Sequence, residues 1–254
     1  MVPVRGDLDE RRSLRRLGGL ADAVLHFAPP PQHGDEDPRT AHLLAALGRR
    51  GSLAQRLVYI STTGVYGDCG GAFIDECRAL RPLSARARRR VDAERRLRRF
   101  ARRHGTALAI LRAPGIYAAD RLPLARLQRG DPVLAAEDDV LTNHIHADDL
   151  ARLACAALFR ARGGRVFNVV DDSRLRMGEY YDLLADRFAL PRPPRLPRAQ
   201  IAAVLSPLTL SFMAESRLID NTRMRRELRV ALRHPTVGDG IAAALNKEQA
   251  PSCW

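Results

Sequence analysis

The sequence predicts an α/β fold built on a doubly wound parallel sheet. Short, continuous apolar runs alternate with longer amphipathic segments along the chain. Because the runs are not interrupted by polar residues, their strands are expected to be buried on both faces, with helices covering each side of the sheet. The chain has 254 residues, 46% of them hydrophobic, which is enough for one large core.

Local signals place the individual elements. Apolar runs predict strands at 2–4, 23–28, 57–61, 107–111 and 166–170. Amphipathic spacing predicts helices at 10–17, 38–47, 84–103, 148–159 and 177–188. Asp9 and Ser84 are expected to cap two of these helices, and Asp37 with Pro38 opens another.

The pattern changes in the last quarter of the chain. After Pro191 the strand–helix alternation gives way to proline-rich linkers and short helices. We therefore expect a sheet domain over residues 1–190 and a small, mostly helical C-terminal cap over residues 191–254.

The chain is strongly basic, with 42 basic and 29 acidic residues and a formal net charge of +13. Lys247 is the only lysine, so all other basic residues are arginine. An imbalance of this kind indicates a bias along the whole chain rather than one basic surface. It also excludes any mechanism that needs a lysine before position 247.

Nothing in the sequence predicts secretion or a membrane span. The first residues lack the basic-then-apolar layout of a signal peptide, and the apolar runs are far shorter than the roughly 20 residues that a span needs. The four cysteines show no CxxC motif and no framework spacing. We expect free thiols in a cytoplasmic protein.

Several segments in order along the chain carry a family resemblance. They include Gly6-Asp-Leu8, the apolar run at 23–28, the run from Tyr59 to Asp68, the run from Leu111 to Tyr117 and the run from His144 to Asp149. Together they resemble the extended short-chain dehydrogenase/reductases of the nucleotide-sugar epimerase/dehydratase type, in particular the atypical branch. The resemblance implies a Rossmann-like fold, an NAD(P) cofactor and a nucleotide-sugar-like small-molecule ligand.

The family opens with a strand, a GxxGxxG turn and a helix that holds the cofactor pyrophosphate. In this sequence the first match corresponds to the family's third strand, so we expect an N-terminally truncated Rossmann-like sheet and doubtful dinucleotide binding. Gly64, Gly67 and Gly70 fit the GxxGxxG pattern. We reject them as the phosphate turn because no helix start follows them.

The family's catalytic residues are only partly matched. Thr62 occupies the position of the catalytic Ser/Thr, while alignment on Glu94 places Arg86 at the tyrosine position and Arg90 at the lysine position. An arginine stays protonated and cannot shuttle a proton as tyrosine does. We therefore expect a protein without the standard Tyr/Lys redox catalysis.

The resemblance also assigns cofactor contacts along the chain. Asp7 and Leu8 would lie at the adenine, Ala28 and Pro29 along the cofactor, and the segment Pro114, Gly115 and Ile116 at the nicotinamide. The alternative is that these residues only form turns and strand ends.

Two other functions stay open. One is a regulatory or scaffold protein that binds no dinucleotide; separately from its function, we expect the chain to form a homo-oligomer through the apolar strand 23–28 as an open sheet edge. The other is a nucleic-acid-associated protein that uses Arg86–Arg103, where ten of 18 residues are arginine. We favour a solvated helix face over nucleic-acid binding, since no aromatic residues are interleaved for stacking.

A metal site is not expected either. His144 and His146 lie two residues apart, with Asp148 and Asp149 following. This spacing permits a metal, but no third ligand stands in a fixed register with them.

Overall fold

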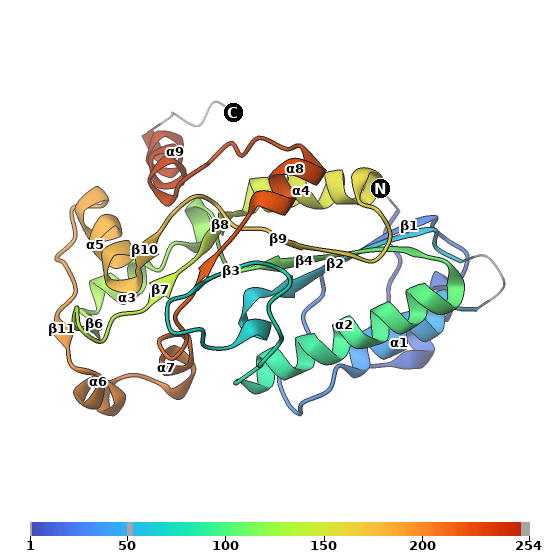
Figure 1. The fold of residues 1–254 in the computed structure, drawn as a ribbon, viewed down its shortest axis with the longest axis horizontal. Coiled ribbons are helices and arrows are strands. Elements are labelled where there is room, and N and C mark those ends of the chain that lie inside the picture. Colours follow the sequence, from blue (N-terminus) through green and yellow to red (C-terminus); the bar gives the residue numbers. More distant parts are fainter. Residues whose placement is uncertain (1, 50–52, 250–254) are drawn as a thin grey trace.

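The structure, a computed structural model, describes residues 2–49 and 53–249, without the side chains of 246–249. It has an elongated shape with two lobes (Figure 1). A layered sheet forms one lobe, and short helices and two-stranded pairings form the other. No helix in the described ranges is long and apolar enough to cross a membrane.

The sheet of the first lobe is parallel and four-stranded. Its order is β1-β2-β4-β9, formed by β1 (Ala23–His26), β2 (Arg56–Thr62), β4 (Ala107–Ala113) and β9 (Arg165–Asn168). β2 and β4 pair along their whole length, from Arg56 with Ala107 to Thr62 with Ala113. These four strands confirm four of the five that the apolar runs predict.

The fifth predicted strand is wrong. Residues 2–4 form no strand, and the side chain of Val2 is 86% exposed. Pro3 has no N–H to donate to a sheet, and no described strand lies beside this segment.

The cap predicted at Asp9 is also wrong, because the following element is a 3-10 helix, η1 (Arg11–Leu17), with Glu10 at its N-cap. Asp9 instead forms an ion pair with Arg39 at 2.6 Å.

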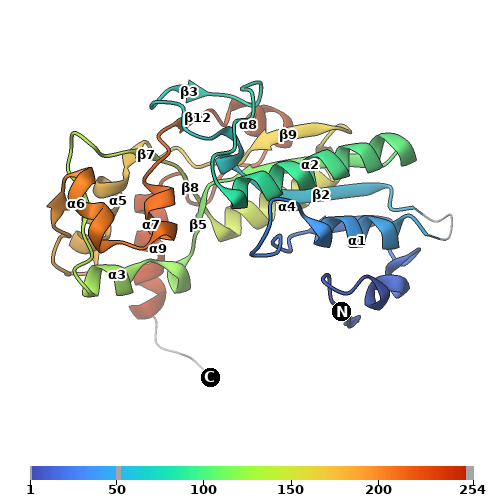
Figure 2. The ribbon, with the colours of Figure 1, turned by 90° about the horizontal axis from the view of Figure 1, so that it is seen from below.

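Helices cover both faces of the sheet (Figures 1 and 2). α1 (Pro38–Leu47) and α2 (Ala85–His104) pack on one face, and α4 (Ala147–Arg160) and α8 (Thr222–Leu228) pack on the other. Successive residues of a strand point to opposite faces. In β2, Tyr59 accordingly packs with α1 and α2, whereas Val58 and Ile60 pack with α4 and α8. Each apolar strand therefore contributes side chains to the two cores, one on each face of the sheet.

The N-terminal caps predicted for α1 and α2 are present. The carboxylate of Asp37 accepts the Thr40 N–H at the start of α1, next to Pro38. The hydroxyl of Ser84 accepts the Ala87 N–H at the start of α2, and Gly105 ends that helix in the left-handed region. The sequence signals and the observed helix ends agree here because both are local.

The glycines after β2 form a tight loop. A 3-10 helix, η2 (Thr63–Tyr66), follows β2, and the short β3 (Phe73–Ile74) comes next. Gly67 has a φ of +70°, and a Cβ there would lie 2.1 Å from the carbonyl oxygen of Arg81. The glycine is needed for close packing of two loop segments. No phosphate turn leading into an α-helix forms at this place.

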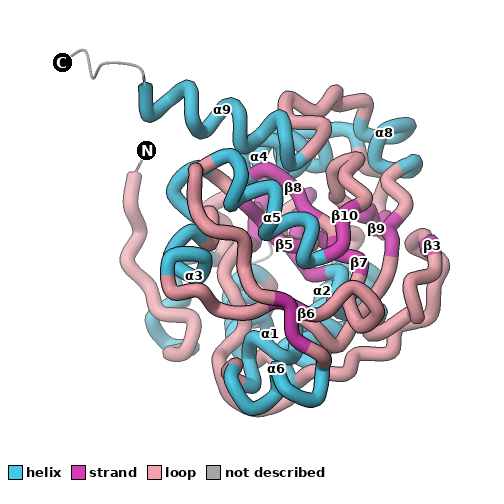
Figure 3. Tube along the Cα trace, turned by 90° about the vertical axis from the view of Figure 1, so that its left-hand side faces the viewer, coloured by secondary structure: helices cyan, strands magenta, loops and turns pink. Residues whose placement is uncertain are grey.

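The second lobe is made of short pairings between distant segments (Figure 3). Its two-stranded pairs are β5 (Gly115–Tyr117) with β8 (His144–His146), β6 (Val133–Leu134) with β11 (Arg195–Leu196), and β7 (Leu141–Thr142) with β10 (Leu175–Arg176). β12 (Leu218–Ile219) pairs with β3. The helical elements are η3 (Ala119–Arg121), α3 (Leu124–Gln128), α5 (Met177–Arg187), α6 (Arg198–Val204), α7 (Pro207–Phe212) and α9 (Val237–Gln249).

Segments on both sides of residue 190 build this lobe. One apolar cluster joins Tyr117, Leu127 and Tyr180 to Val237 and Ile241. The division at residue 190 stays a prediction.

Candidate functional site

A small cavity lies at the carboxyl end of β2, where the two lobes meet. Its volume is about 160 Å³. The loop after β2, the first turn of α2, the start of β5 and the end of α7 contribute side chains to its wall. The lining residues are Thr62, Thr63, Gly64, Arg86, Pro114, Gly115, Leu141, Thr142, Asn143, Met177, Ser211, Phe212, Glu215 and Arg217. We call this cavity the Thr62 pocket. Ligands of parallel α/β sheets bind at this edge, beyond the carboxyl ends of the strands.

Thr62 is the last residue of β2. Its hydroxyl oxygen accepts the Gly64 N–H at 3.2 Å, which caps η2. A hydroxyl that accepts one bond can still donate its own proton. Thr62 can therefore serve the loop and a ligand in the pocket at the same time.

Arg86 lies in the first turn of α2 and is half-buried. Its guanidinium carbon is 4.2 Å from the centre of the Phe212 ring, a cation–π arrangement. Burial lowers the pKa of Arg86, which the nearby Glu215 carboxylate partly opposes. Among the described residues, no carboxylate lies within 4.0 Å of Arg86. The guanidinium stays charged, and its charge is available to a ligand.

A second arginine closes the pocket from the C-terminal segment. Arg217 donates to the Gly67 carbonyl and to the Glu215 carboxylate, each at 2.7 Å. Its Nε is buried and has no hydrogen-bond partner among the described residues. Since Glu215 neutralises Arg217, Arg86 is the cation that a ligand would meet.

Arg90 lies outside the pocket wall. Its Nη1 donates to the Ile60 carbonyl at 2.6 Å and to the Tyr59 hydroxyl at 3.0 Å. Burial raises the pKa of Tyr59, so this phenol stays protonated. Arg90 therefore holds the end of β2 against α2.

A buried polar network between β2, α2 and β4 lies next to the pocket. The Glu94 carboxylate accepts hydrogen bonds from Ser61, at 2.7 Å, and from the Arg112 guanidinium. Arg112 also donates to the Tyr66 hydroxyl at 2.9 Å, which in turn donates to Asn168 at 2.7 Å. Ser61 precedes Thr62, so this network fixes the strand end that presents the threonine.

The predicted cofactor contacts lie in three separate places: the Thr62 pocket, the end of β1 and a surface hollow near the N-terminus. Pro114 and Gly115 line the Thr62 pocket, and Ile116, 38% exposed, follows them in β5. Ala28 and Pro29 follow β1, and the Pro29 carbonyl accepts from Arg39 at 3.2 Å.

Asp7 and Leu8 line a separate surface hollow together with Arg39. The Asp7 carboxylate accepts the Asp9 N–H at 2.9 Å and so forms a turn. The structure thus brings Thr62, Arg86, Pro114 and Gly115 together. Arg90, Asp7, Leu8, Ala28 and Pro29 are not among the residues that line this pocket.

Sequence reasoning missed the pocket residues from the C-terminal segment. Phe212, Glu215 and Arg217 lie more than 90 residues after Gly115 along the chain. No motif marks them, because their position depends on how α7 and β12 pack on the first lobe. The pairing of β12 with β3 and the bond from Arg217 to the Gly67 carbonyl bring this segment to the end of β2.

Comparisons with known proteins identify the family of this chain. The model of the NAD dependent epimerase/dehydratase family matches residues 3–170. The chain belongs to this family. No curated protein matches the chain.

Solved structures with this fold agree with the family assignment. A functionally unknown conserved protein from Silicibacter pomeroyi DSS has 30% sequence identity and a TM-score of 0.78, with 89% of this chain and 77% of that chain covered. The UDP-glucose 4-epimerase from Thermotoga maritima, solved with UDP-glucose, has 17% identity and a TM-score of 0.76, covering 96% and 84%. The UDP-glucuronic acid 4-epimerase from Bacillus cereus, in complex with NAD, has 18% identity and a TM-score of 0.71, covering 93% and 78%.

Of the cofactor contacts that the family resemblance assigns, only Pro114 and Gly115 line the Thr62 pocket. Pro114 and Gly115, beside Thr62, would lie at the nicotinamide. A pyrophosphate needs backbone N–H donors or a free helix N-terminus. The helix after β1 instead begins with the carboxylate of Asp37, which accepts the Thr40 N–H at 3.1 Å. Within 2–49 and 53–249 we find no Gly-rich turn that leads into a helix and would hold a pyrophosphate.

Proposed function

We propose that this chain is an atypical family member that binds a nucleotide-sugar-like ligand, with one ring or small polar group in the Thr62 pocket. The observation that supports this proposal is the meeting of Thr62, Arg86, Pro114 and Gly115 in one cavity. These residues come from three separate segments that the family resemblance singles out independently.

The size of the pocket limits what it holds. Pockets for drug-sized ligands have volumes of about 300–1,000 Å³, and this one has about 160 Å³. A single sugar ring is of this order, whereas a complete nucleotide sugar or dinucleotide is not. The nucleotide part of the ligand would lie outside the pocket, across the open carboxyl edge of the sheet.

The charges of the pocket favour an anionic group on the ligand. Arg86 has no ion-pair partner within the described residues, and the pocket's other arginine is neutralised by Glu215. A phosphate or carboxylate facing Arg86 would form charge-assisted hydrogen bonds. The hydroxyl of Thr62 would donate to a sugar oxygen.

The same residues argue against the family's usual acid–base step. That step needs a phenol whose pKa is lowered by a neighbouring lysine. Arg86 and Arg90 stand at those two positions, and neither exchanges a proton near neutral pH. We therefore propose binding without Tyr/Lys proton transfer. Because no Gly-rich turn in the described ranges leads into a helix that would hold a pyrophosphate, we also propose only weak affinity for NAD(P).

The arginine-rich helix does not favour the nucleic-acid alternative. Arg88, Arg96 and Arg98 form ion pairs with Asp35, Asp92 and Glu94, respectively. Arg89 and Arg90 donate to backbone carbonyls, and Arg86 stacks on Phe212. Six of the ten arginines on this helix therefore already have intramolecular partners, and these contacts reduce the basic face that is open to a nucleic acid.

Calorimetry with UDP-glucose, UDP-glucuronic acid and NADPH tests the proposal. We expect a UDP-sugar to bind, the glucuronic acid form more tightly, and NADPH to show no micromolar affinity. Arg86→Ala should weaken sugar-nucleotide binding by about 10- to 100-fold, the loss of charge-assisted hydrogen bonds of about 1.5–3 kcal/mol. Arg95→Ala, an exposed position on the same helix, is the control and should bind as the parent does. Equal affinities of Arg86→Ala and the parent would refute the proposed site.

A further inference from the structure

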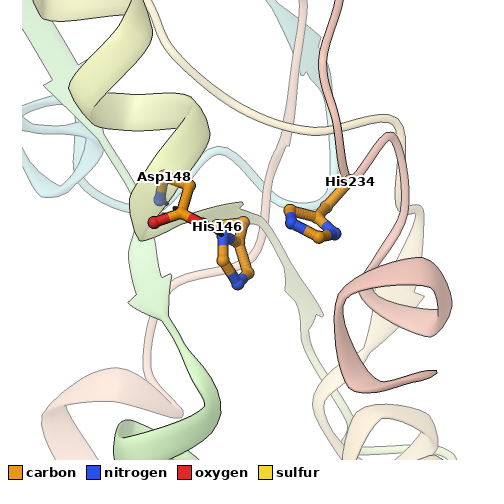
Figure 4. A group of neighbouring side chains, drawn as sticks. All are labelled: His146, Asp148 and His234. Carbon is orange, nitrogen blue, oxygen red and sulfur yellow. Dashed lines mark hydrogen bonds and ion pairs between the residues drawn. The ribbon is translucent and has the colours of Figure 1, made fainter. Parts of the chain in front are cut away.

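A second cluster of side chains lies away from the Thr62 pocket. Its members are His146 at the end of β8, Asp148 in the first turn of α4, and His234 between α8 and α9. One potential ligand atom from each residue lies within 4.8 Å of the others. Figure 4 shows the two imidazoles side by side, with the Asp148 carboxylate next to the His146 ring. We propose that these three residues bind a first-row divalent metal ion, with Zn²⁺ as the probe.

The donor set suits such an ion. Two imidazole nitrogens and one carboxylate oxygen are typical ligands of Zn²⁺ and related metals, and three protein ligands leave one position open. Tetrahedral ligands at 2.0–2.2 Å from the metal lie about 3.4 Å apart. The Asp148 carboxylate is 3.9 Å from His146 Nδ1, and its side chain is 53% exposed. A rotation of this exposed carboxylate would close the remaining distance.

His234 is held in place by a carboxylate that is not itself a ligand. Asp149 is fully buried and accepts the N–H groups of Arg233 and His234, each at 2.8 Å. These bonds attach the segment before α9 to the same helix end that carries His146 and Asp148. The three side chains are therefore close together before any metal binds, which lowers the cost of binding. The two imidazole rings lie with centroids 3.9 Å apart at an angle of 41°, so coordination requires a ring rotation but no movement of the backbone.

Tyr117 supports the cluster from the other side. Its ring lies edge-on to His146, with centroids 5.2 Å apart and an interplanar angle of 86°. Its hydroxyl donates to the Thr236 carbonyl at 3.2 Å. The tyrosine thus orients one ligand and anchors the segment of another, as an outer-shell residue of a metal site does.

Two local features are unfavourable to a cation at this cluster, the positive end of the α4 dipole and a hydrogen bond accepted by His146, but both are weak or compensated. The N-terminal end of α4 carries a partial positive charge, which the neighbouring carboxylates of Asp148 and Asp149 counter. His146 Nδ1 accepts the Asp148 N–H at 3.2 Å. A metal bound at Nδ1 would replace this long hydrogen bond.

The sequence could not show this site. His146 and Asp148 are close in the chain, and the expectation of no metal followed from the missing third ligand. His234 supplies that ligand from a distant segment, placed there by Asp149. The cluster shares no residue with the Thr62 pocket.

Metal titration of the full, untagged chain tests the proposal. After treatment with a chelator, we expect one equivalent of Zn²⁺ to bind with low-micromolar affinity in calorimetry. Co²⁺ in its place should give the weak visible bands of nitrogen and oxygen ligands, without the intense near-ultraviolet bands of thiolate ligation by an exposed cysteine. The absorption spectrum reads the ligand set independently of any activity.

His234→Gln and Asp148→Asn are the test variants, since both side chains reach the surface and their loss leaves the core intact. Each should weaken Zn²⁺ binding by at least about tenfold and remove the Co²⁺ bands. His33→Gln, an exposed histidine outside the cluster, should change neither. Binding that survives both test variants, or no stoichiometric Zn²⁺ binding by the parent, would overturn the proposal.

Discussion

Arg112 donates two hydrogen bonds to Glu94, from Nη2 to Oε2 at 2.8 Å and from Nε to Oε1 at 3.1 Å, and both side chains are buried. β4 carries the arginine and α2 the glutamate. The pair therefore ties the helix to the sheet directly below the Thr62 pocket. Hydrogen bonding and attraction to Glu94 raise the pKa of Arg112 despite its burial.

Removing one partner of this pair should be costly. Glu94→Gln leaves the Arg112 guanidinium buried without a counter-charge, and we expect a loss of about 3–5 kcal/mol in the free energy of unfolding. Urea denaturation measures the loss. Glu36→Gln, which removes an exposed partner of Arg96, is the control and should cost less than about 1 kcal/mol. Similar losses in the two variants would show that the buried pair has no special role.

Gly67 and Gly70 form a matched pair for testing the loop after β2. Both have positive φ, but a Cβ would meet the Arg81 carbonyl at 2.1 Å only at Gly67, while nothing lies within 4 Å at Gly70. Gly70→Ala should cost about 1–2 kcal/mol, the price of the left-handed conformation alone. Gly67→Ala should cost more, because Gly67 combines φ +70° with ψ −159°, a region that is essentially limited to glycine, and its Cβ would clash with the Arg81 carbonyl. Thermal unfolding compares them, and equal costs would mean that the loop moves away without resistance.

The Asp171 carboxyl gives stability a pH dependence. Burial raises its pKa from 3.8 to about 7, and its Oδ2 has no partner among the described residues. The folded state therefore holds a proton that the unfolded state releases near pH 4. Its contribution to stability is present below pH 4 and is lost as the pH rises to about 7.

Asp171→Asn removes this dependence because the amide does not titrate. Relative to the parent, we expect the variant to gain on the order of 2 kcal/mol in unfolding free energy between pH 5 and pH 8. Asp172→Asn, at the more exposed neighbouring position, should show no such gain. Parallel pH profiles for Asp171→Asn and the parent would contradict the assignment.

Restoring the family's tyrosine should not restore its chemistry. In Arg86→Tyr the phenol would enter the Thr62 pocket, but Arg90 is engaged by the Ile60 carbonyl and the Tyr59 hydroxyl. No lysine lies nearby to lower the new phenol's pKa. We expect no NAD(P)-dependent conversion of UDP-glucose, measured by chromatography of the nucleotide-sugar products, since an epimerase returns its hydride and leaves no reduced nicotinamide. Turnover in Arg86→Tyr but not in the parent would show that the alignment is right and that a lysine is dispensable.

Those parts of the fold that depend on local signals were predictable. Residues 57–60 are all apolar and alternate between the two helix layers, which is the pattern of a strand buried on both faces. The caps at Asp37 and Ser84 depend on bonds within one turn. The two-residue strands of the second lobe carry no such signal, because β6 and β11 pair across more than 60 residues.

The candidate site was predictable only for residues such as Thr62 and Pro114, each of which lies in a short continuous motif at a strand end. Thr62 ends β2 and Pro114 follows β4, and the two strand ends meet at one edge of a parallel sheet, so the proximity of these residues follows from the fold class. Arg90 was assigned by position, yet its long side chain bonds to the nearer backbone carbonyl of Ile60. Phe212, at the end of α7, and His234, between α8 and α9, were not predicted, since contacts with distant segments place both.

The two edges of the sheet differ in how they are protected. At β9, the Asn168 N–H donates to Glu76, the Val166 carbonyl accepts from Arg223, and Arg165 pairs with Glu227. At β1, no strand in the described ranges pairs on the side away from β2. Leu25 is 42% exposed and Phe27 47% exposed there. An apolar, unpaired edge is a template for pairing with another chain.

We therefore expect the chain to self-associate through β1 as its concentration rises. Light scattering coupled to gel filtration should show a mass above that of the 28.2 kDa monomer. Leu25→Lys places a charge on the edge and should shift the equilibrium to monomer, as lysines do on natural edge strands. Val204→Lys, at an exposed apolar position on α6, controls for added charge alone and should leave the association unchanged. A parent that stays monomeric across the concentration range, or a Val204→Lys variant as dissociated as Leu25→Lys, would show that β1 is not the interface.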